Sequence, residues 1–169
     1  MADAFDALLD DFQRALAGRD DGAFAAVCAP DVHYEDPLCA EPLVGPAALV
    51  EHLRRLWAGV SDVRVETTGP RVSDGRFVAG PCKVLGTHTG TLGSIPPTRR
   101  PLAVHVMLYV ELDPPQERLW RVRAFFDLYD AAVQVGVLPA RNTLAERTML
   151  MMRGFGLRAK GARGVTPRR

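Results

Sequence analysis

Apolar and polar residues alternate along the first part of the chain with the spacing of helices. Large apolar residues recur every three or four positions through residues 3–17, and Gly18 closes that segment. A second, short helix is expected over GAFAAVC, with Asp20 or Asp21 as its cap and Pro30 ending it. The pattern therefore predicts two consecutive helices before any strand.

A third helix is predicted from Pro46, a residue favoured in the first helical turn. Its expected buried stripe consists of Leu49, Leu53, Leu56 and Trp57. VHYED, ahead of this helix, is interpreted as a short strand, and EPLVG as a loop.

After Gly59 the pattern changes to period two, with many β-branched residues. The turn sequences SDGR and DPPQER and the long irregular stretch TLGSIPPTRRP separate the alternating segments. Strands are predicted near residues 62–69, 76–88, 101–112 and 118–128. Helices that precede an antiparallel meander indicate the α+β class, and a curved sheet around the helices would leave a pocket at its open end.

Composition narrows the class of protein. The chain has 169 residues, of which 47% are hydrophobic and 24% charged, as in an ordinary globular domain. It has no apolar run near the roughly 20 residues that span a bilayer, so no membrane association is expected. The acidic, helical N-terminus does not resemble a signal peptide. Three scattered cysteines favour free thiols and a cytoplasmic location.

Charge divides the chain into two parts. Residues 140–169 hold eight Lys and Arg against one acid, so the 21 basic and 20 acidic residues of the whole chain leave 13 and 19 for residues 1–139. We expect one domain over 1–139, followed by a helix from Asn142 to about Arg153 and a basic, disordered end. Thr143 and Glu146 have the spacing of a capping box. A solvated tail is favoured, and nucleic acid is not expected as a partner.

Three stretches carry a family resemblance. YEDPLCAEPLVG resembles the segment of ketosteroid isomerase that contains its general base. GTHTGTLGSIPPTRR resembles the G-T-H-x-G and I-P-P-T-G-R signature of SnoaL-like polyketide cyclases. FFDLYDAAVQVGVLP resembles their closing segment, an aspartate followed seven residues later by Q-x-G. Both groups belong to the nuclear transport factor 2-like superfamily, and the resemblance covers about residues 3–139.

The resemblance implies a cone-shaped α+β fold, a curved mixed or antiparallel sheet wrapped around the N-terminal helices. It also implies a pocket for a small, apolar, oxygen-bearing molecule, chemistry without a cofactor, and a homodimer formed through the convex sheet face.

Asp36 is the first candidate catalytic residue. Alternation along VHYED places Val32, Tyr34 and Asp36 on one face and His33 and Glu35 on the other. Val32 indicates that the first face is buried, and burial among apolar neighbours would raise the pKa of Asp36 toward that of a useful base. The alternative is an inert turn aspartate before Pro37.

His88 and Asp127 are the other two candidates. His88, in GTHTG, could polarise a carbonyl oxygen, with the glycines leaving room for a ligand, or could be held structurally within its strand. Asp127 matches the cyclase acid/base by resemblance, although alternation places it on the outer face. A bulge near Phe125–Phe126 could redirect it; otherwise it is a surface acid, and Asp130 is a weaker rival.

Several side chains are candidate pocket walls. The mixed face of the strand that contains His105 could line the pocket or a dimer interface, and a histidine there is more often structural. The predicted substrate-binding residues are Tyr34, Phe12, Trp57, His105, Leu108 and Phe125. Phe12 and Leu108 stand where ketosteroid isomerase has its two oxyanion donors, so neither donor is expected here.

Other chemistries lack their motifs. The four histidines show no H-x-H or H-E-x-x-H spacing, and C-x-x-C is absent, so no metal site is predicted. An R-x-D on a central strand, which the limonene epoxide hydrolase branch needs, is absent from 76–112. The sequence thus favours proton abstraction beside a carbonyl, leading to isomerisation or aldol cyclisation. The alternative is a non-catalytic binding domain on the same fold.

Overall fold

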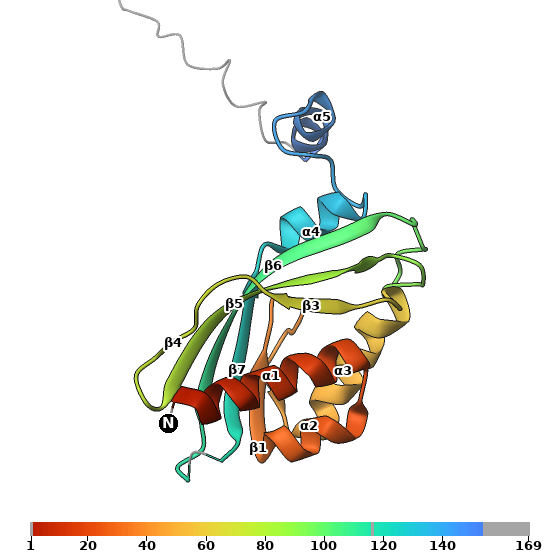
Figure 1. The fold of residues 1–169 in the computed structure, drawn as a ribbon. Coiled ribbons are helices and arrows are strands. Elements are labelled where there is room, and N and C mark those ends of the chain that lie inside the picture. Colours follow the sequence, from red (N-terminus) through yellow and green to blue (C-terminus); the bar gives the residue numbers. More distant parts are fainter. Residues whose placement is uncertain (1, 116, 154–169) are drawn as a thin grey trace, which may run out of the picture.

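The computed structural model describes residues 2–115 and 117–153. Its N-terminal half contains three helices, α1 (Ala2–Gly18), α2 (Asp21–Val27) and α3 (Pro46–Gly59), which lie on one side of a curved sheet (Figure 1). Asp20 caps α2 by accepting hydrogen bonds from the backbone N–H groups of Gly22 and Ala23. The helices predicted from the apolar spacing are confirmed.

The sheet consists of seven strands. They are β1 (Cys28–Glu35), β2 (Leu43–Val44), β3 (Arg64–Thr67), β4 (Val72–Ser73), β5 (Phe77–Thr87), β6 (Pro101–Leu112) and β7 (Leu119–Phe126). The main order is β2-β1-β7-β6-β5-β3, with β4 paired to β5. All neighbours are antiparallel except β1 and β7, which run parallel. The sheet is mixed and curved, and the predicted α+β class is observed.

The start of β1 differs from the prediction. Pro30 was expected to end the second helix, but that helix ends at Val27 and Pro30 lies inside β1. A proline cannot donate to a sheet ladder, and the register between β1 and β7 shifts between Cys28 and His33. The irregular pairing is what accommodates the proline. The short strands β2 and β4 were also missed.

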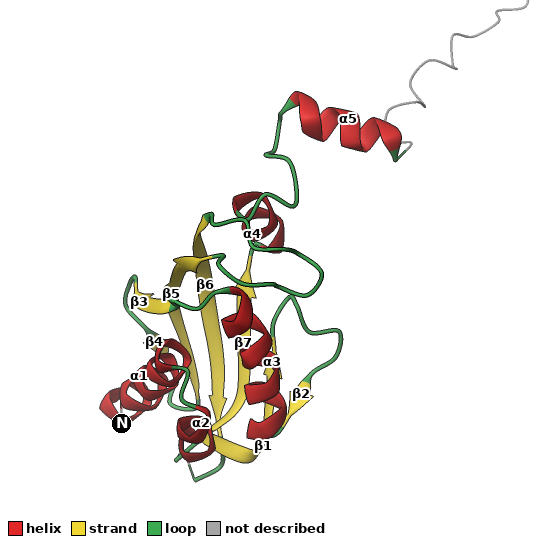
Figure 2. Ribbon diagram, turned by 90° about the vertical axis from the view of Figure 1, so that its right-hand side faces the viewer, coloured by secondary structure: helices red, strands yellow, loops and turns green. Residues whose placement is uncertain are grey.

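Alternation along the strands sets which side chains are buried. Val32, Tyr34 and Asp36 are buried, whereas His33 and Glu35 are half-buried, as predicted. The even-numbered residues of β6 from Val104 to Val110 are buried, and His105, Met107 and Tyr109 are exposed. The core therefore lies between the concave face of the sheet and the helices (Figure 2).

Two helices follow the sheet. Helix α4 (Leu128–Gln134) was not predicted; the side-chain amide of Gln134 pairs with the backbone N–H and C=O of Ala103 and pins α4 against β6. Helix α5 (Leu144–Met152) was predicted, and Thr143 caps it through the N–H of Glu146. Figure 1 shows α5 projecting away from the sheet. The predicted disordered end, residues 156–169, lies outside the described residues.

Within the described ranges, no helix is both long enough and apolar enough to cross a bilayer.

Candidate functional site

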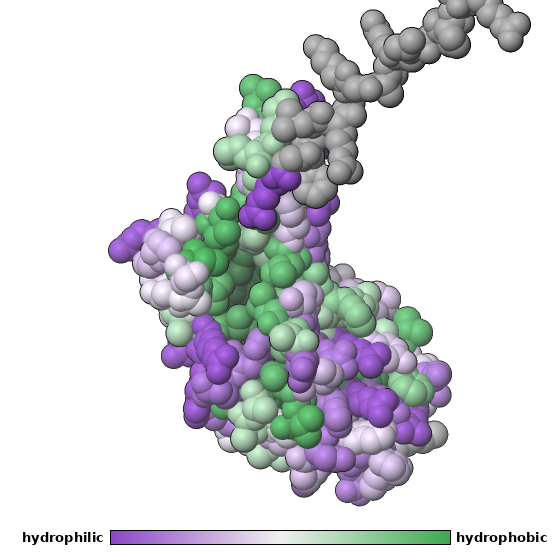
Figure 3. Space-filling model, turned by 180° about the vertical axis from the view of Figure 1, so that it is seen from behind, coloured by the Kyte–Doolittle hydropathy of each residue, from purple (hydrophilic) through white to green (hydrophobic). Residues whose placement is uncertain are grey.

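A cavity of about 240 Å³ lies between the concave sheet face and the helices. Its walls come from α1, α3, α4, the strands and the segment around Leu92 and Ile95, and they are almost entirely aliphatic and aromatic. Viewed from behind, the molecule shows a hollowed hydrophobic area bordered by hydrophilic surface (Figure 3). The polar members of the lining are few: Gln13 on α1, Tyr34 on β1 and Asp36 just beyond it, with the thiol of Cys82 on β5.

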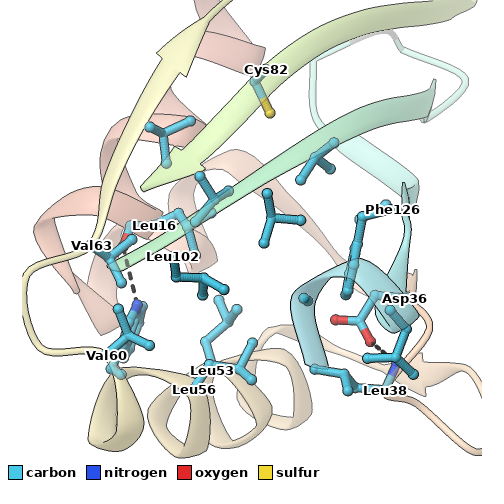
Figure 4. A pocket seen from close by; sticks show the side chains of 18 of the residues that line it. Leu16, Asp36, Leu38, Leu53, Leu56, Val60, Val63, Cys82, Leu102 and Phe126 are labelled. Atoms are coloured by element: carbon cyan, nitrogen blue, oxygen red, sulfur yellow. Dashed lines mark hydrogen bonds between the residues drawn. The ribbon is translucent and has the colours of Figure 1, made fainter. Parts of the chain in front are cut away.

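Asp36 lies at the edge of this apolar lining, near Phe126 and Leu38 (Figure 4). Only 1% of its side chain is exposed. Its Oδ2 accepts hydrogen bonds from the Tyr34 hydroxyl at 3.0 Å and from His52 Nε2 at 2.8 Å. A carboxylate can only accept, so His52 carries its hydrogen on Nε2.

The second carboxylate oxygen of Asp36 organises a turn. Oδ1 accepts from the backbone N–H groups of Leu38 at 2.7 Å and Cys39 at 3.1 Å. Pro37 has no N–H to offer, so the turn is closed by the next two residues. Asp36 is therefore both the turn aspartate and the buried pocket acid that the sequence presented as alternatives.

The pKa of Asp36 is lowered, contrary to the expected increase. Burial raises it, but the hydrogen bond and charge of His52, with the hydrogen bonds from Leu38 and Tyr34, outweigh burial and bring the pKa below its ordinary value of 3.8. Asp36 is consequently ionised at neutral pH. Burial, followed by the charge and hydrogen bond of Asp36, raises the pKa of Tyr34 well above 10.0, so its phenol stays protonated.

His52 was not identified from the sequence. It comes from α3, and its ring centroid lies 5.9 Å from that of Tyr34. Neither its spacing nor its neighbours signal the contact, because α3 meets the end of β1 only through the tertiary fold. His52 is not part of the cavity lining, so it supports Asp36 from behind.

Asp36, His52 and Cys39 together form the cluster that could hold a metal ion. Their ligand atoms lie within 4.8 Å of one another, and Cys39 Sγ is 3.9 Å from His52 Nε2. An ionised carboxylate offers about four lone-pair positions, and four donors already occupy those of Asp36. The cluster is arranged as a hydrogen-bond network, and a cation would have to displace one of these donors.

His88 does not reach the cavity. Its side chain is fully buried, and Nδ1 lies 3.0 Å from the Thr98 hydroxyl. Its backbone pairs with Arg99 and Arg100, which fastens the long segment after β5 back onto that strand. The nearby glycine Gly90 serves packing: a Cβ there would lie 1.8 Å from the carbonyl oxygen of Ala58. The structure therefore corrects the expectation that the glycines of GTHTG leave room for a ligand.

Asp127 also lies outside the cavity lining. It is exposed and caps α4, accepting a hydrogen bond from the N–H of Asp130 and pairing with Arg141 at 2.8 Å. The hydrogen bond from the N–H of Asp130, together with the charge and hydrogen bond of Arg141, outweighs the opposing desolvation and lowers the pKa of Asp127. The β6–β7 register shows no bulge at Phe125–Phe126 that could redirect it. Asp127 is therefore a surface acid, which was the alternative to its redirection by a bulge. Asp130 is also exposed and outside the cavity lining.

The motif around Asp127 has a structural purpose. Asp127 begins α4, Gln134 fixes it to β6, and Gly136, with φ +85°, lets the chain turn after it. The cavity lining includes Leu128, Ala131, Ala132 and Val135 of this segment. The Asp-to-Gln-x-Gly spacing thus builds a wall of the cavity.

The predicted wall residues divide into two groups. Phe12, Tyr34, Trp57 and Leu108 line the cavity. His105 and Phe125 do not, because both are exposed at positions of β6 and β7 that alternate with the buried ones. Phe126, one residue further along, takes the place expected for Phe125.

Comparison with known proteins identifies the family. The family model of the SnoaL-like domain matches residues 9–122, more than half of the chain. The chain belongs to the SnoaL-like family. No curated protein matches it.

Many solved structures share the fold of this SnoaL-like domain. AclR from Streptomyces galilaeus, a proposed hydroxylase, has a TM-score of 0.71 at 17% identity, with 91% of this chain and 94% of that chain covered. IdmH from Streptomyces antibioticus, a proposed polyketide cyclase, has a TM-score of 0.65 at 21% identity, covering 78% and 98%. A Catenulispora acidiphila protein with a ketosteroid isomerase-like fold, in complex with trimethylamine, has a TM-score of 0.66 at 18% identity, covering 78% and 93%. The curved, unclosed sheet is that of the nuclear transport factor 2-like cone fold.

Proposed function

We propose that this SnoaL-like domain binds a small, largely apolar, oxygen-bearing molecule and catalyses proton transfer next to its carbonyl group, without a cofactor. The observation that carries the proposal is Asp36, an ionised carboxylate at the wall of a largely apolar cavity. It is supported by His52 and hydrogen-bonded to Tyr34. The family membership and the cyclase and isomerase names among the structural relatives are in keeping with this chemistry.

The chemistry begins with an exchange of hydrogen bonds. All lone-pair positions of Asp36 are occupied, so Oδ2 must lose a donor before it can accept a proton. Tyr34 lines the cavity, and its hydroxyl can turn from Asp36 to the carbonyl oxygen of the ligand. This movement frees Oδ2 and supplies a donor to the oxygen at which negative charge develops.

Proton abstraction then follows at the adjacent carbon. The C–H bond breaks, its proton moves to Asp36 Oδ2, and its electron pair forms the carbon–carbon double bond of an enolate whose charge rests on the oxygen held by Tyr34. In a ligand with a double bond between the β and γ carbons, return of the proton from Asp36 to the γ carbon gives isomerisation. Alternatively, the enolate carbon attacks a second carbonyl, whose oxygen takes the proton from Asp36, and aldol cyclisation results. His52 and the turn N–H groups hold the carboxylate in place throughout.

Hydrogen–deuterium exchange tests the proposal. The protein is incubated in D₂O with trans-2-decalone, a compact ketone, and deuterium uptake beside the carbonyl is followed by mass spectrometry. General-base catalysis contributes about 10²–10⁴-fold, so the wild type is expected to accelerate uptake clearly over buffer. Asp36→Asn should lose the acceleration and keep binding the ketone, as judged by quenching of Trp57 fluorescence.

Asp127→Ser is the matched comparison, because serine removes the carboxylate but can still cap α4. Exchange at the wild-type rate is expected. Loss of exchange in this variant with full activity in Asp36→Asn would contradict the assignment of the acid. Ketone binding without any acceleration by the wild type would favour the non-catalytic binding alternative.

A further inference from the structure

Gln13 is a polar residue of the cavity that the proposed chemistry does not use. It lies on α1, only 7% of it is exposed, and it contributes to the cavity lining. Its Nε2 is buried and has no hydrogen-bond partner among the described residues. A buried polar group left unpaired is unfavourable, and its usual explanation is a missing water or ligand.

The orientation of this amide is fixed by its neighbours. Oε1 accepts from the Thr67 hydroxyl at 3.2 Å and from Arg71 Nη2 at 3.5 Å. A guanidinium can only donate, so the oxygen of Gln13 must face Arg71 and the amino group must face away. Turning the amide over would bring two donors together.

Arg71 is itself held firmly. Its side chain is only 10% exposed; Nη1 donates to the backbone carbonyl of Asp6 at 2.8 Å, and Nη2 pairs with Asp10. Through Arg71, the acids of α1 therefore position Gln13. This arrangement fixes the orientation of an unpaired N–H donor on a residue that lines the apolar cavity.

Gln13 lies at a different part of the cavity from Asp36. Thr67, which anchors Gln13, stands opposite Cys82 in the β3–β5 pair, whereas Asp36 follows β1. Figure 4 shows Cys82 and Asp36 on separate sides of the cavity, with apolar side chains between them. Three strands, β7, β6 and β5, separate β1 from β3 in the sheet.

We infer that Gln13 donates a hydrogen bond to a second oxygen of the ligand, so that the substrate class consists of molecules with an acceptor oxygen at each end of a rigid apolar frame. The inference rests on the function proposed above for the same cavity. In that function, Tyr34 donates a hydrogen bond to the reacting carbonyl oxygen beside Asp36. Gln13 would donate to the remote oxygen, and the two contacts together would fix the orientation of the ligand.

Two matched series of probes test the inference. The first is trans-decalin, trans-2-decalone and trans-decalin-2,6-dione, and the second is 5α-androstane with its 3-ketone and 3,17-dione. The frames differ in the separation of their oxygens, so between them they sample a short and a long cavity. Dissociation constants are measured by tryptophan fluorescence, to which the cavity residue Trp57 contributes, for the wild type, Gln13→Met and Gln13→Glu.

In the wild type, the dione of at least one series should bind about tenfold more tightly than its mono-ketone. Gln13→Met, of similar length, should abolish this preference, so that the dione binds no more tightly than its mono-ketone. Gln13→Glu keeps an oxygen toward Thr67 and Arg71 but offers the ligand no N–H, and should also lose the preference. Because Gln13→Glu keeps the contacts with Thr67 and Arg71, a lost preference in this variant reports the missing N–H donor and not damage to the fold.

The opposing results are equally clear. A dione preference that survives both substitutions, or no preference in either series, would overturn the inference and leave the Gln13 amide simply hydrated. Ketone exchange catalysed by Asp36 would stand in either case. If no probe of any kind binds, the proposed function fails, and the inference fails with it.

Discussion

The carboxylate of Asp36 accepts hydrogen bonds from four donors, and these donors determine its pKa. An aspartate buried among aliphatic side chains alone would hold its proton at higher pH. Here His52, Tyr34 and two backbone N–H groups favour the charged form. The site contains a weak base that is always ionised at neutral pH, so its effectiveness depends on the ligand displacing a donor.

His52→Leu removes the hydrogen bond and charge that lower the pKa of Asp36, while burial, which raises it, remains. If Asp36 is the base, the acid limb of the ketone-exchange rate should therefore lie at higher pH in His52→Leu than in the wild type. Exchange rates measured between pH 3 and 8 check this shift. His33→Leu removes a histidine from the other face of β1 and should leave the profile in place; an equal shift there would argue against the contact.

The same substitution affects folding. The pKa of Asp36 is lower in the folded protein than its ordinary value of 3.8, so its ionisation stabilises the fold above that pH and the contribution is lost as pH falls through the folded pKa. The difference in free energy of unfolding between wild type and His52→Leu should shrink on acidification. Urea unfolding at pH 7 and pH 3 measures it.

Alternation along β1 was enough to predict that Tyr34 and Asp36 point inward. It could not reveal His52, because the two residues meet only when α3 packs beside the end of β1. The direction of the pKa shift followed from that missing partner. Gln13 was hidden for a similar reason: a glutamine in an amphipathic helix looks solvent-exposed until Thr67 and Arg71 are seen beside it.

At the level of elements, the segment after β5 depends on close contact with the end of α3. Thr89 and Gly90 both donate backbone hydrogen bonds to the carbonyl oxygen of Gly59. This contact positions Leu92 and Ile95, which line the cavity. The second glycine of GTHTG, Gly90, is thus needed for the approach of two backbones.

Gly90→Ala should be strongly destabilising, because its Cβ would lie 1.8 Å from the Ala58 carbonyl oxygen and the backbone must move. We expect a loss of more than about 2 kcal/mol in the free energy of unfolding. Gly18→Ala, where the added carbon meets nothing within 4 Å, is the control and should change stability by less than about 0.5 kcal/mol. Equal effects in thermal or urea unfolding would contradict this account of the contact.

Elements with a long repeating pattern were predictable, and short ones were not. The helices α1 and α3 and the strands β5 and β6 carry many periods of their pattern. Helix α4 has seven residues that directly follow a strand, so its apolar positions read as a continuation of that strand. Pro30 was wrongly predicted to end the second helix. It lies inside β1, where the irregular pairing with β7 tolerates a residue that usually ends helices and strands.

For the whole molecule, the outer face of the sheet is the notable surface. Met107 and Phe125 stand opposite each other on β6 and β7, 43% and 55% exposed, and Tyr109 lies beside them at 37%. Adjoining exposed apolar side chains of this kind are typical of contact surfaces. We propose this face as the contact surface of the dimer that the family resemblance implied.

Phe125→Glu places a charge at the centre of this face and should convert a dimer into a monomer. Sedimentation velocity measures the change. Leu144→Glu, at a residue on α5 that is 80% exposed and so more accessible than Phe125, is the control and should leave the mass unchanged. A wild-type protein that is already monomeric, or a dimer that survives Phe125→Glu, would remove this face from consideration.

The placement of acids around the cavity has a stereochemical consequence. Among the described residues that line it, Asp36 is the one carboxylate, so a proton can be taken up and delivered from a single side. A ligand held at both ends cannot turn over between the two events. Isomerisation here would be suprafacial, with the proton removed and returned on the same face of the ligand. A deuterium atom on the face toward Asp36 would be transferred to the second carbon, while the hydrogen on the opposite face of the first carbon would stay in place.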